Sequence, residues 1–232
     1  MGDVDKDFRW LPVLAPLLPV AVPMPLAKGM PAEGYPWEWG VYPWLEGENP
    51  TADGIAEPVS LARDMARFVA ALRRVDLAGG PPASRGAPLA TRDEATRTAI
   101  AALQGMIDTD AASAAWEAAL ETPAWSGPPV WVHGDLLSGN VLVQGGRVTG
   151  VIDFSGMGVG DPACDLMIAW GLFSGESRQV FRAALAVDDE TWARGRGHAL
   201  SQALIFIPYY LHTNHVGVRA AQRTVGEVLA EG

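Results

Sequence analysis

The chain has 232 residues, of which 49% are hydrophobic and 19% charged, so it can build a real core and is not a disordered chain. Its net charge of −10 argues against binding to nucleic acids and against a general attraction to anionic membranes. A single cysteine, Cys164, cannot form an internal disulfide, so a reducing, cytoplasmic location is expected.

The N-terminal segment is predicted to be a short helix followed by strands. Residues 3–11 favour a helix that stops before Pro12. The uncharged run 11–27 contains five prolines and follows three aspartates, which argues against a membrane span and a signal peptide. Residues 20–46 are predicted to be strands. The polar, breaker-rich segment 47–54 then predicts a boundary between a unit of residues 1–46 and a unit of residues 47–232.

The second unit opens with helical patterns. Apolar residues recur at helical spacing, and the expected helices cover residues 55–77, 91–107 and 110–120. Thr91 and Glu94 resemble a capping box, and Asp110 is the expected cap of the third helix. Residues 78–90 are rich in glycine and proline and are predicted to be a loop.

A strand and a hairpin follow, and the rest of the chain is predicted to be mainly helical after Pro162. The strand covers residues 130–133, and the hairpin pairs residues 141–143 with 148–154 around Gly145 and Gly146. Polar residues cluster at the ends of these strands, where rigid elements commonly hold catalytic groups on loops.

Three of these polar residues suit phosphoryl transfer. Asn140 and Asp153 stand at the two ends of the hairpin and could converge on Mg²⁺, which takes oxygen ligands and keeps some waters or phosphate oxygens. Asp135, five residues before Asn140, is then free to orient a hydroxyl and accept its proton. Taken singly, each acid is more simply explained as a turn or cap residue. Together, His-x-Asp-x-x-x-x-Asn and a hairpin that ends in Ile-Asp match the kinase catalytic loop.

The motifs Val132-His133-Gly134-Asp135 through Asn140, Val151-Ile152-Asp153-Phe154 and Gly160-Asp161-Pro162 through Leu166 resemble the aminoglycoside phosphotransferase family. Segments 9–12, 25–29 and 35–47 resemble its N-lobe and hinge less specifically. The resemblance implies an α+β, protein-kinase-like fold, with a truncated β-rich N-lobe and a mainly helical C-lobe that carries a catalytic strand, loop and hairpin. It also implies ATP and Mg²⁺ as cofactors.

The resemblance also implies a role for each matching residue. Asp135 would be the catalytic base, and Asn140 and Asp153 would bind Mg²⁺. His133 would pack and hydrogen-bond beneath the catalytic loop, and Asp165 would brace that loop through backbone amides.

The hinge of the family corresponds to Tyr42, Trp44 and Leu45, which would offer backbone groups to the adenine of the nucleotide. The same residues also satisfy a simpler interpretation as a core strand and its exit. Trp37, Trp39 and Trp44 could line a cleft, but ordinary packing explains them more simply.

The sequence departs from the family at its front. A kinase N-lobe has a glycine-rich hairpin over the phosphates and a strand lysine paired with a helix acid. Neither Lys6 nor Lys28 comes on a strand before that helix, and the helix acid could be Asp5 or Asp7. We therefore expect weak binding of ATP·Mg²⁺ by the chain as written.

The leading functional hypothesis is a small-molecule kinase that transfers the ATP γ-phosphate to a hydroxyl of an antibiotic or metabolite. The acceptor would be an aminoglycoside, a macrolide or a related hydroxyl compound. Two alternatives stay open. One is a catalytically impaired fragment or pseudokinase that acts as a binding module. The other is a metal-dependent phosphohydrolase, for which further histidine ligands are lacking.

Overall fold

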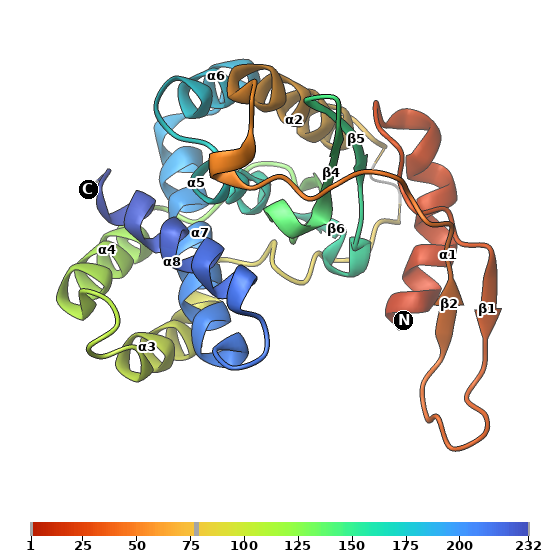
Figure 1. The fold of residues 1–232 in the computed structure, drawn as a ribbon, viewed down its shortest axis with the longest axis horizontal. Coiled ribbons are helices and arrows are strands. Elements are labelled where there is room, and N and C mark those ends of the chain that lie inside the picture. The colour runs from red at the N-terminus through yellow and green to blue at the C-terminus, as the bar shows by residue number, and fades with distance from the viewer. Residues whose placement is uncertain (1, 77–78, 232) are drawn as a thin grey trace.

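The computed structural model describes residues 2–76 and 79–231. It consists of a helical body and an N-terminal arm, whose β1–β2 hairpin extends away from the body in Figure 1 while α1 packs against it through Trp10 and Trp131. The arm contains α1 (Asp3–Leu14), β1 (Ala27–Gly29) and β2 (Trp39–Val41). In the described ranges, no helix combines the length and the apolar character that crossing a bilayer requires.

Helix α1 runs through Pro12, so the prediction that it stops before this proline is wrong. Proline removes one helical hydrogen bond, but packing offsets this loss. Leu11 and Leu14 are fully buried, and the amide of Ala15 donates to the carbonyl of Leu11. The apolar face of the last turn therefore holds the helix past the proline.

The predicted strands of the arm are shorter than expected. β1 and β2 pair in antiparallel register over three residues each, while residues 22–26 form extended chain without a ladder. Ala21 forms a β-bridge to the body, because its amide donates to Thr149 and its carbonyl accepts from Val151 of β5 (Arg147–Val151), at 3.0 Å each. Pro19, Pro23 and Pro25 lack the amide donors that a longer ladder needs.

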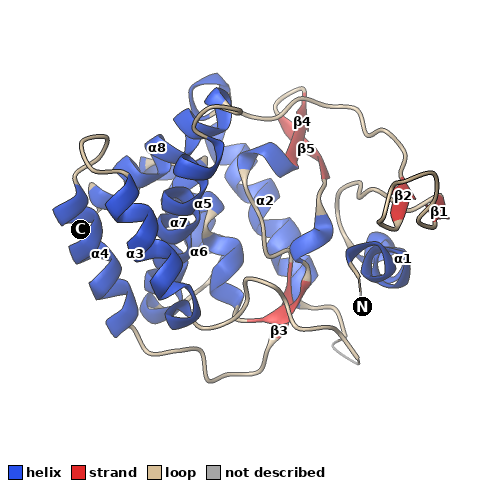
Figure 2. Ribbon diagram, turned by 90° about the horizontal axis from the view of Figure 1, so that it is seen from below, coloured by secondary structure: helices blue, strands red, loops and turns tan. Residues whose placement is uncertain are grey.

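The body is built mainly from helices, as predicted, around one apolar core (Figure 2). These helices are α2 (Pro58–Arg73), α3 (Asp93–Ala102), α4 (Thr109–Glu121), α5 (Ile168–Gly171), α6 (Gly175–Leu185), α7 (Asp189–Tyr210) and α8 (His215–Leu229). The core draws on both ends of the body, since α2 packs on α6, and α7 packs on α3, α4 and α8.

Both predicted helix caps are wrong. No side chain caps α3, because the hydroxyl of Thr91 donates to the carbonyl of Pro88 and a 3₁₀ turn, Leu89–Arg92, precedes the helix. Helix α4 is capped by Asp108, whose carboxylate accepts from the amide of Ala111 at 2.9 Å. Asp110 lies in the first helical turn instead, where its negative charge interacts favourably with the positive end of the helix dipole.

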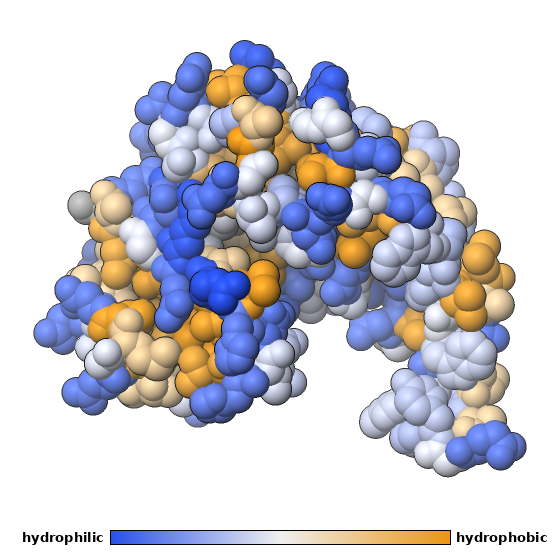
Figure 3. Space-filling view, in the orientation of Figure 1, coloured by the Kyte–Doolittle hydropathy of each residue, from blue (hydrophilic) through white to orange (hydrophobic). Residues whose placement is uncertain are grey.

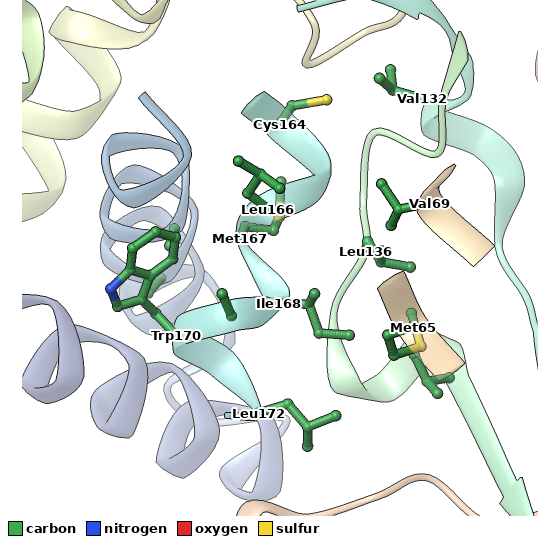
Figure 4. Packing of buried hydrophobic residues seen from close by; sticks show 14 of the residues in the cluster. Met65, Val69, Val132, Leu136, Cys164, Leu166, Met167, Ile168, Trp170 and Leu172 are labelled. Atoms are coloured by element: carbon green, nitrogen blue, oxygen red, sulfur yellow. The ribbon is translucent and has the colours of Figure 1, made fainter. Parts of the chain in front are cut away.

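The predicted strand and hairpin are present. β3 (Val130–Val132) pairs antiparallel with β6 (Gly158–Gly160), and β4 (Val141–Gln144) pairs antiparallel with β5. Short 3₁₀ turns at Ser138–Asn140 and Phe154–Gly156 connect these strands to the polar residues singled out in the sequence. Figure 4 shows Leu136, in the loop after β3, pointing into the core beside Met65 and Ile168. The loop after β3 is therefore anchored by burial.

Candidate active site

The floor of the candidate site is a fully buried carboxylate. Asp165 accepts hydrogen bonds from the amides of His133 at 2.8 Å and Gly134 at 2.9 Å. Burial raises the pKa of Asp165, while the charges of His133 and Arg73 and the two amides act in the opposite direction. The ring of His133 contacts the carbonyl of Ile152 at 3.0 Å and stacks edge-on against Phe154. His133 thus connects the loop after β3 to the end of β5.

Gly134 allows this loop to approach the turn 154–156 closely. It has a φ of +81°, which favours glycine, and a Cβ at this position would lie 2.4 Å from the carbonyl oxygen of Gly156. Asp135 follows directly, with its amide 3.2 Å from Nδ1 of His133 and its side chain 14% exposed. The close backbone contact therefore sets the position of Asp135.

Asn140 contacts this loop directly, and Asp153 follows a residue that is hydrogen-bonded to Asn140. The amide nitrogen of Asn140 donates to the carbonyl of Asp135 at 2.8 Å, which leaves Oδ1 as the atom that could coordinate a cation. The carbonyl of Asn140 accepts from the amide of Ile152 at 2.9 Å, and Asp153 is the next residue. A side-chain hydrogen bond of Asn140 and a backbone hydrogen bond of Ile152 therefore link the segments that carry Asp135, Asn140 and Asp153.

The exposed Asp153 has a φ of 60°, and its Oδ1 accepts from the hydroxyl of Ser155 at 2.7 Å. A non-glycine residue in this left-handed region is often found at functional sites. The described part of the chain contains no cluster of three or more His, Cys, Asp or Glu side chains that could hold a metal. The oxygens of Asn140 and Asp153 fit Mg²⁺ only as a pair of ligands completed by water or phosphate oxygens.

A residue that the sequence analysis did not identify contacts Asp135. Nη1 of Arg85 lies 2.7 Å from Oδ1 of Asp135 and 3.4 Å from the carbonyl of Gly134. Arg85 comes from the glycine- and proline-rich loop before α3, where no hydrophobic periodicity predicts its position. Its only sequence signal is a cation in a segment otherwise built of small residues and prolines.

The arm places Asp7, and not Asp5, toward the site. The hydroxyl of Tyr42 donates to Oδ2 of Asp7 at 2.8 Å, while Oδ1 of Asp7 is buried without a hydrogen-bond partner among the described residues. Burial raises the pKa of Asp7, and the nearby charge of Asp153 acts in the same direction. Asp5 instead forms an exposed ion pair with Lys28. The structure therefore favours Asp7 over Asp5 as the candidate helix acid, a choice that the sequence left open.

Lys6 crosses from the arm to the body. It is 8% exposed, and its ammonium group donates to the carbonyl of Ser155, two residues after Asp153. Lys28 lies on β1 and pairs with Asp5 and with Glu38, the latter at 3.0 Å. Both lysines of the chain are therefore engaged away from the unpartnered oxygen of Asp7.

The three predicted hinge residues have different surroundings. Tyr42 faces Asp7, and burial raises its pKa, as does the hydrogen bond to Asp7. Trp44 is 85% exposed and lines an open depression of about 830 Å³ with Glu46 and the turn of the β4–β5 hairpin. Leu45 lies near Gly150 of β5. The simpler expectation of ordinary packing does not hold for the exposed Trp44 and Trp37, whereas the ring of the partly exposed Trp39 packs on Gly29 of β1.

The fold is that of the protein-kinase-like antibiotic phosphotransferases. A structure titled as the GDP and kanamycin complex of APH(2")-IIia superposes with a TM-score of 0.71, covering 99% of this chain and 83% of that one at 18% identity. The apoenzyme of the macrolide 2'-phosphotransferase MphH from Brachybacterium faecium gives 0.56, covering 97% and 79% at 26% identity. The α+β fold expected from the sequence, with its short N-lobe, is confirmed.

The chain belongs to the phosphotransferase enzyme family, whose model matches residues 1–198. It is also 26% identical over 190 residues to the uncharacterized protein YcbJ of Bacillus subtilis, covering 78% of this chain. The chain spans 58% of the length of that relative. The family and its structural neighbours support the general class of small-molecule phosphotransferases.

Proposed function

We propose that this chain is a small-molecule kinase that transfers the γ-phosphate of ATP to a hydroxyl group of an antibiotic or a metabolite. The observation that supports this proposal is the pair of hydrogen bonds by which Asn140 holds the carbonyl of Asp135 and the amide of Ile152, the residue before Asp153. The protein would act in the cytoplasm, where ATP is available and its single thiol stays reduced.

In the proposed reaction, Asp135 is the catalytic base. The acceptor hydroxyl hydrogen-bonds to its carboxylate, and the proton passes to that carboxylate as the oxygen attacks the γ-phosphorus. The bond between the γ-phosphorus and the β-γ bridging oxygen breaks, and ADP leaves. Asn140 and Asp153 would hold Mg²⁺, which when bound offsets the negative charge of the phosphates. The chain itself supplies position, because the hydrogen bonds to Asp165 fix the start of the loop.

The nucleotide would lie between the hinge and the β4–β5 hairpin. Tyr42, Trp44 and Leu45 belong to the extended segment whose continuation bonds to β4 through Glu48 and Val143, at 3.0 and 2.9 Å. Since one structural neighbour was solved with GDP, both ATP and GTP are donors to test. The same neighbour also holds kanamycin, and another is a macrolide phosphotransferase, which makes both antibiotics reasonable first acceptors.

The proposal is tested by a screen of ATP and GTP with Mg²⁺ against kanamycin, a macrolide and simple polyols, with the product followed by ³¹P NMR. Asp135→Asn keeps the size of the side chain but removes the proton acceptor. The rate should fall by about 10²–10⁴-fold, as for the loss of a general base.

The matched control is Asp110→Asn, an exposed aspartate in the first turn of α4, which should keep the wild-type rate. Phosphorylation of an acceptor at the wild-type rate by the Asp135 variant would remove this residue from the mechanism.

A binding module without catalysis is the second candidate, and one observation favours it. Oδ1 of Asp7 is buried without a hydrogen-bond partner among the described residues, while Lys6 and Lys28 are engaged elsewhere. A kinase pairs its helix acid with a lysine that contacts the phosphates. Calorimetry separates the two candidates: nucleotide binding without transfer to any acceptor would favour the binding module.

A further inference from the structure

Arg85 occupies a fixed position beside the proposed base. The segment before it pairs with β6, because the amide of Ala83 donates to Val159 at 2.9 Å and the amide of Ser84 donates to Gly156 at 3.3 Å. After it, the carbonyl of Gly86 accepts from the amide of Asp161 at 3.0 Å. A Cβ on Gly86 would lie 3.0 Å from the Cα of Gly160, so the two backbones are in contact. These contacts bring Arg85 to Asp135 on an ordered backbone.

A second arginine, Arg92, lies close enough to Arg85 to be affected by its charge. Nε of Arg92 donates to the hydroxyl of Ser201 at 2.8 Å, and Nη2 donates to Gln202 at 3.1 Å, both on α7. Burial lowers the pKa of Arg92 to about 10, and the charge of Arg85 acts in the same direction while that of Asp135 opposes it. Both other charges are therefore close enough to act on Arg92.

The two arginines carry more positive charge than their ion pairs neutralise. Among the described residues, Arg85 has one ion-pair partner, Asp135, and Arg92 has none. The other carboxylates of the site have different partners, since Asp165 accepts from two amides and Asp153 accepts from the hydroxyl of Ser155. The guanidinium of Arg85 has five N–H donors, and its single recorded contacts to Asp135 and Gly134 leave several unused.

We infer that Arg85, supported by Arg92, is a specificity-determining residue that selects an acceptor with a carboxylate or phosphate group next to the reacting hydroxyl. This inference rests on the proposed function, in which Asp135 orients that hydroxyl. Any hydroxyl bonded to Asp135 brings its neighbouring substituents within reach of the Arg85 guanidinium, which lies 2.7 Å from the same carboxylate. An anionic substituent gains charge-assisted hydrogen bonds there, and an ammonium group is repelled.

The test uses four sugars that differ mainly in charge: D-glucosamine, D-glucose, D-glucuronate and glucose 6-phosphate. Binding to the full chain is followed at low ionic strength through the arginine Nε–Hε signals in NMR, without nucleotide. The two anions should shift the Arg85 signal and bind about tenfold tighter than glucose, while glucosamine binds most weakly. The comparison of the two anions distinguishes a carboxylate ligand from a phosphate ligand.

Arg85→Gln should remove the tenfold preference for the anions over glucose, whereas Arg85→Lys should keep part of it. Arg97→Gln is the matched control, because Arg97 is exposed on α3 and pairs with Asp93 and Glu117 away from the site. Tighter binding of glucosamine than of glucuronate overturns the inference. So does an Arg85 signal that no anion shifts even at high millimolar concentration. The wild-type order of affinities decides the question even if Arg85→Gln does not fold.

A failure of the proposed function gives a different result. Phosphate transfer to the same four sugars is therefore measured on the wild-type chain with ATP and Mg²⁺, separately from binding. A chain that prefers anions at Arg85 but transfers no phosphate keeps the inference about the ligand and loses the kinase. A chain that phosphorylates a polyamine but not its anionic analogue keeps the kinase and loses the inference.

Discussion

The two sides of the candidate site differ in how completely their polar groups are partnered. On the side of the body, Asp165 accepts from two amides, and Oδ1 of Asp135, which makes no hydrogen bond among the described residues, is paired with the charge of Arg85 at 2.7 Å. On the side of the arm, Asp7 keeps a buried oxygen without a partner among the described residues. Figure 3 shows the molecule hollowed between these two sides. The arm also exposes large apolar side chains, namely Leu26, Met30, Tyr35, Trp37, Trp39 and Val41.

The body and the arm therefore hold their candidate groups in place to different degrees. The proposed proton transfer and metal binding would need groups that are held in place before the substrate arrives, and the body holds the candidate groups through hydrogen bonds to its backbone. The arm touches this machinery through Lys6 and the extended segment at Ala21. The proposed acceptor side is therefore held by hydrogen bonds and an ion pair, whereas the arm leaves one carboxylate oxygen of Asp7 without a hydrogen bond among the described residues.

The largest effect is expected on the side of the body, from the substitution Gly134→Ala. A Cβ would lie 2.4 Å from the carbonyl oxygen of Gly156 and would occupy a backbone conformation that favours glycine. We expect the free energy of unfolding to fall by about 3 kcal/mol or more, since strain and a backbone clash combine. Denaturant titration measures this change.

Gly139→Ala is the matched control, because no atom lies within 4 Å of a Cβ at that position of the same loop. It should change the free energy of unfolding by less than about 0.5 kcal/mol. Equal effects at the two positions would show that the close contact at Gly134 does not hold the loop.

The pH dependence of the free energy of unfolding tests the burial of His198 near Arg92 and Arg194. The pKa of His198 is lowered to about 3 by burial, and then by the charges of Arg92 and Arg194. The unfolded chain binds a proton at this residue below about pH 6.5, while the folded chain does not. Stability is therefore complete above pH 6.5 and is lost as the pH falls, by about 2 kcal/mol between pH 7 and pH 5.

Chemical denaturation at a series of pH values checks this contribution as a difference between variants. His198→Gln should lose this part of the pH dependence, whereas the exposed His212→Gln should keep it. If both variants follow the wild-type profile, His198 does not remain neutral in the fold.

Lys6→Met tests the link between the two sides. The ammonium group of Lys6 donates to the carbonyl of Ser155, so its loss should loosen α1 from the body. The cost should be about 1 kcal/mol, because removal of a buried ammonium group offsets part of the lost hydrogen bond. Hydrogen exchange of the α1 amides measures it. Lys28→Met, an exposed lysine paired with Asp5 and Glu38, should leave this exchange unchanged.

The sequence predicts the body better than the arm, for a physical reason. The hairpin has strong local signals, since alternating apolar residues and Gly145-Gly146 specify it and β4 and β5 form as expected. Pro12 and the capping residues mislead because tertiary packing and a neighbouring 3₁₀ turn override local preference.

Local sequence patterns likewise predict some residues of the candidate site and miss others. The motif gave Asp135, Asn140 and Asp153 through their spacing. Arg85 reaches the site through long-range pairing of a loop with β6, and no local pattern encodes such a contact. The choice of Asp7 over Asp5 likewise depends on which face of α1 meets the body.

The smallest effect on stability is expected at the hinge. Trp44 is 85% exposed, so Trp44→Ala should change the free energy of unfolding by less than about 0.5 kcal/mol. If its ring meets the base of the nucleotide, the dissociation constant for ATP should rise about fivefold or more, the lower range for stacking on an aromatic side chain. Trp37→Ala is the matched control, because Trp37 is also exposed but lies on the arm. An unchanged dissociation constant in the Trp44 variant would restrict the hinge to backbone contacts. A similar rise in both variants would instead show that the arm as a whole, and not the hinge alone, contributes to nucleotide binding.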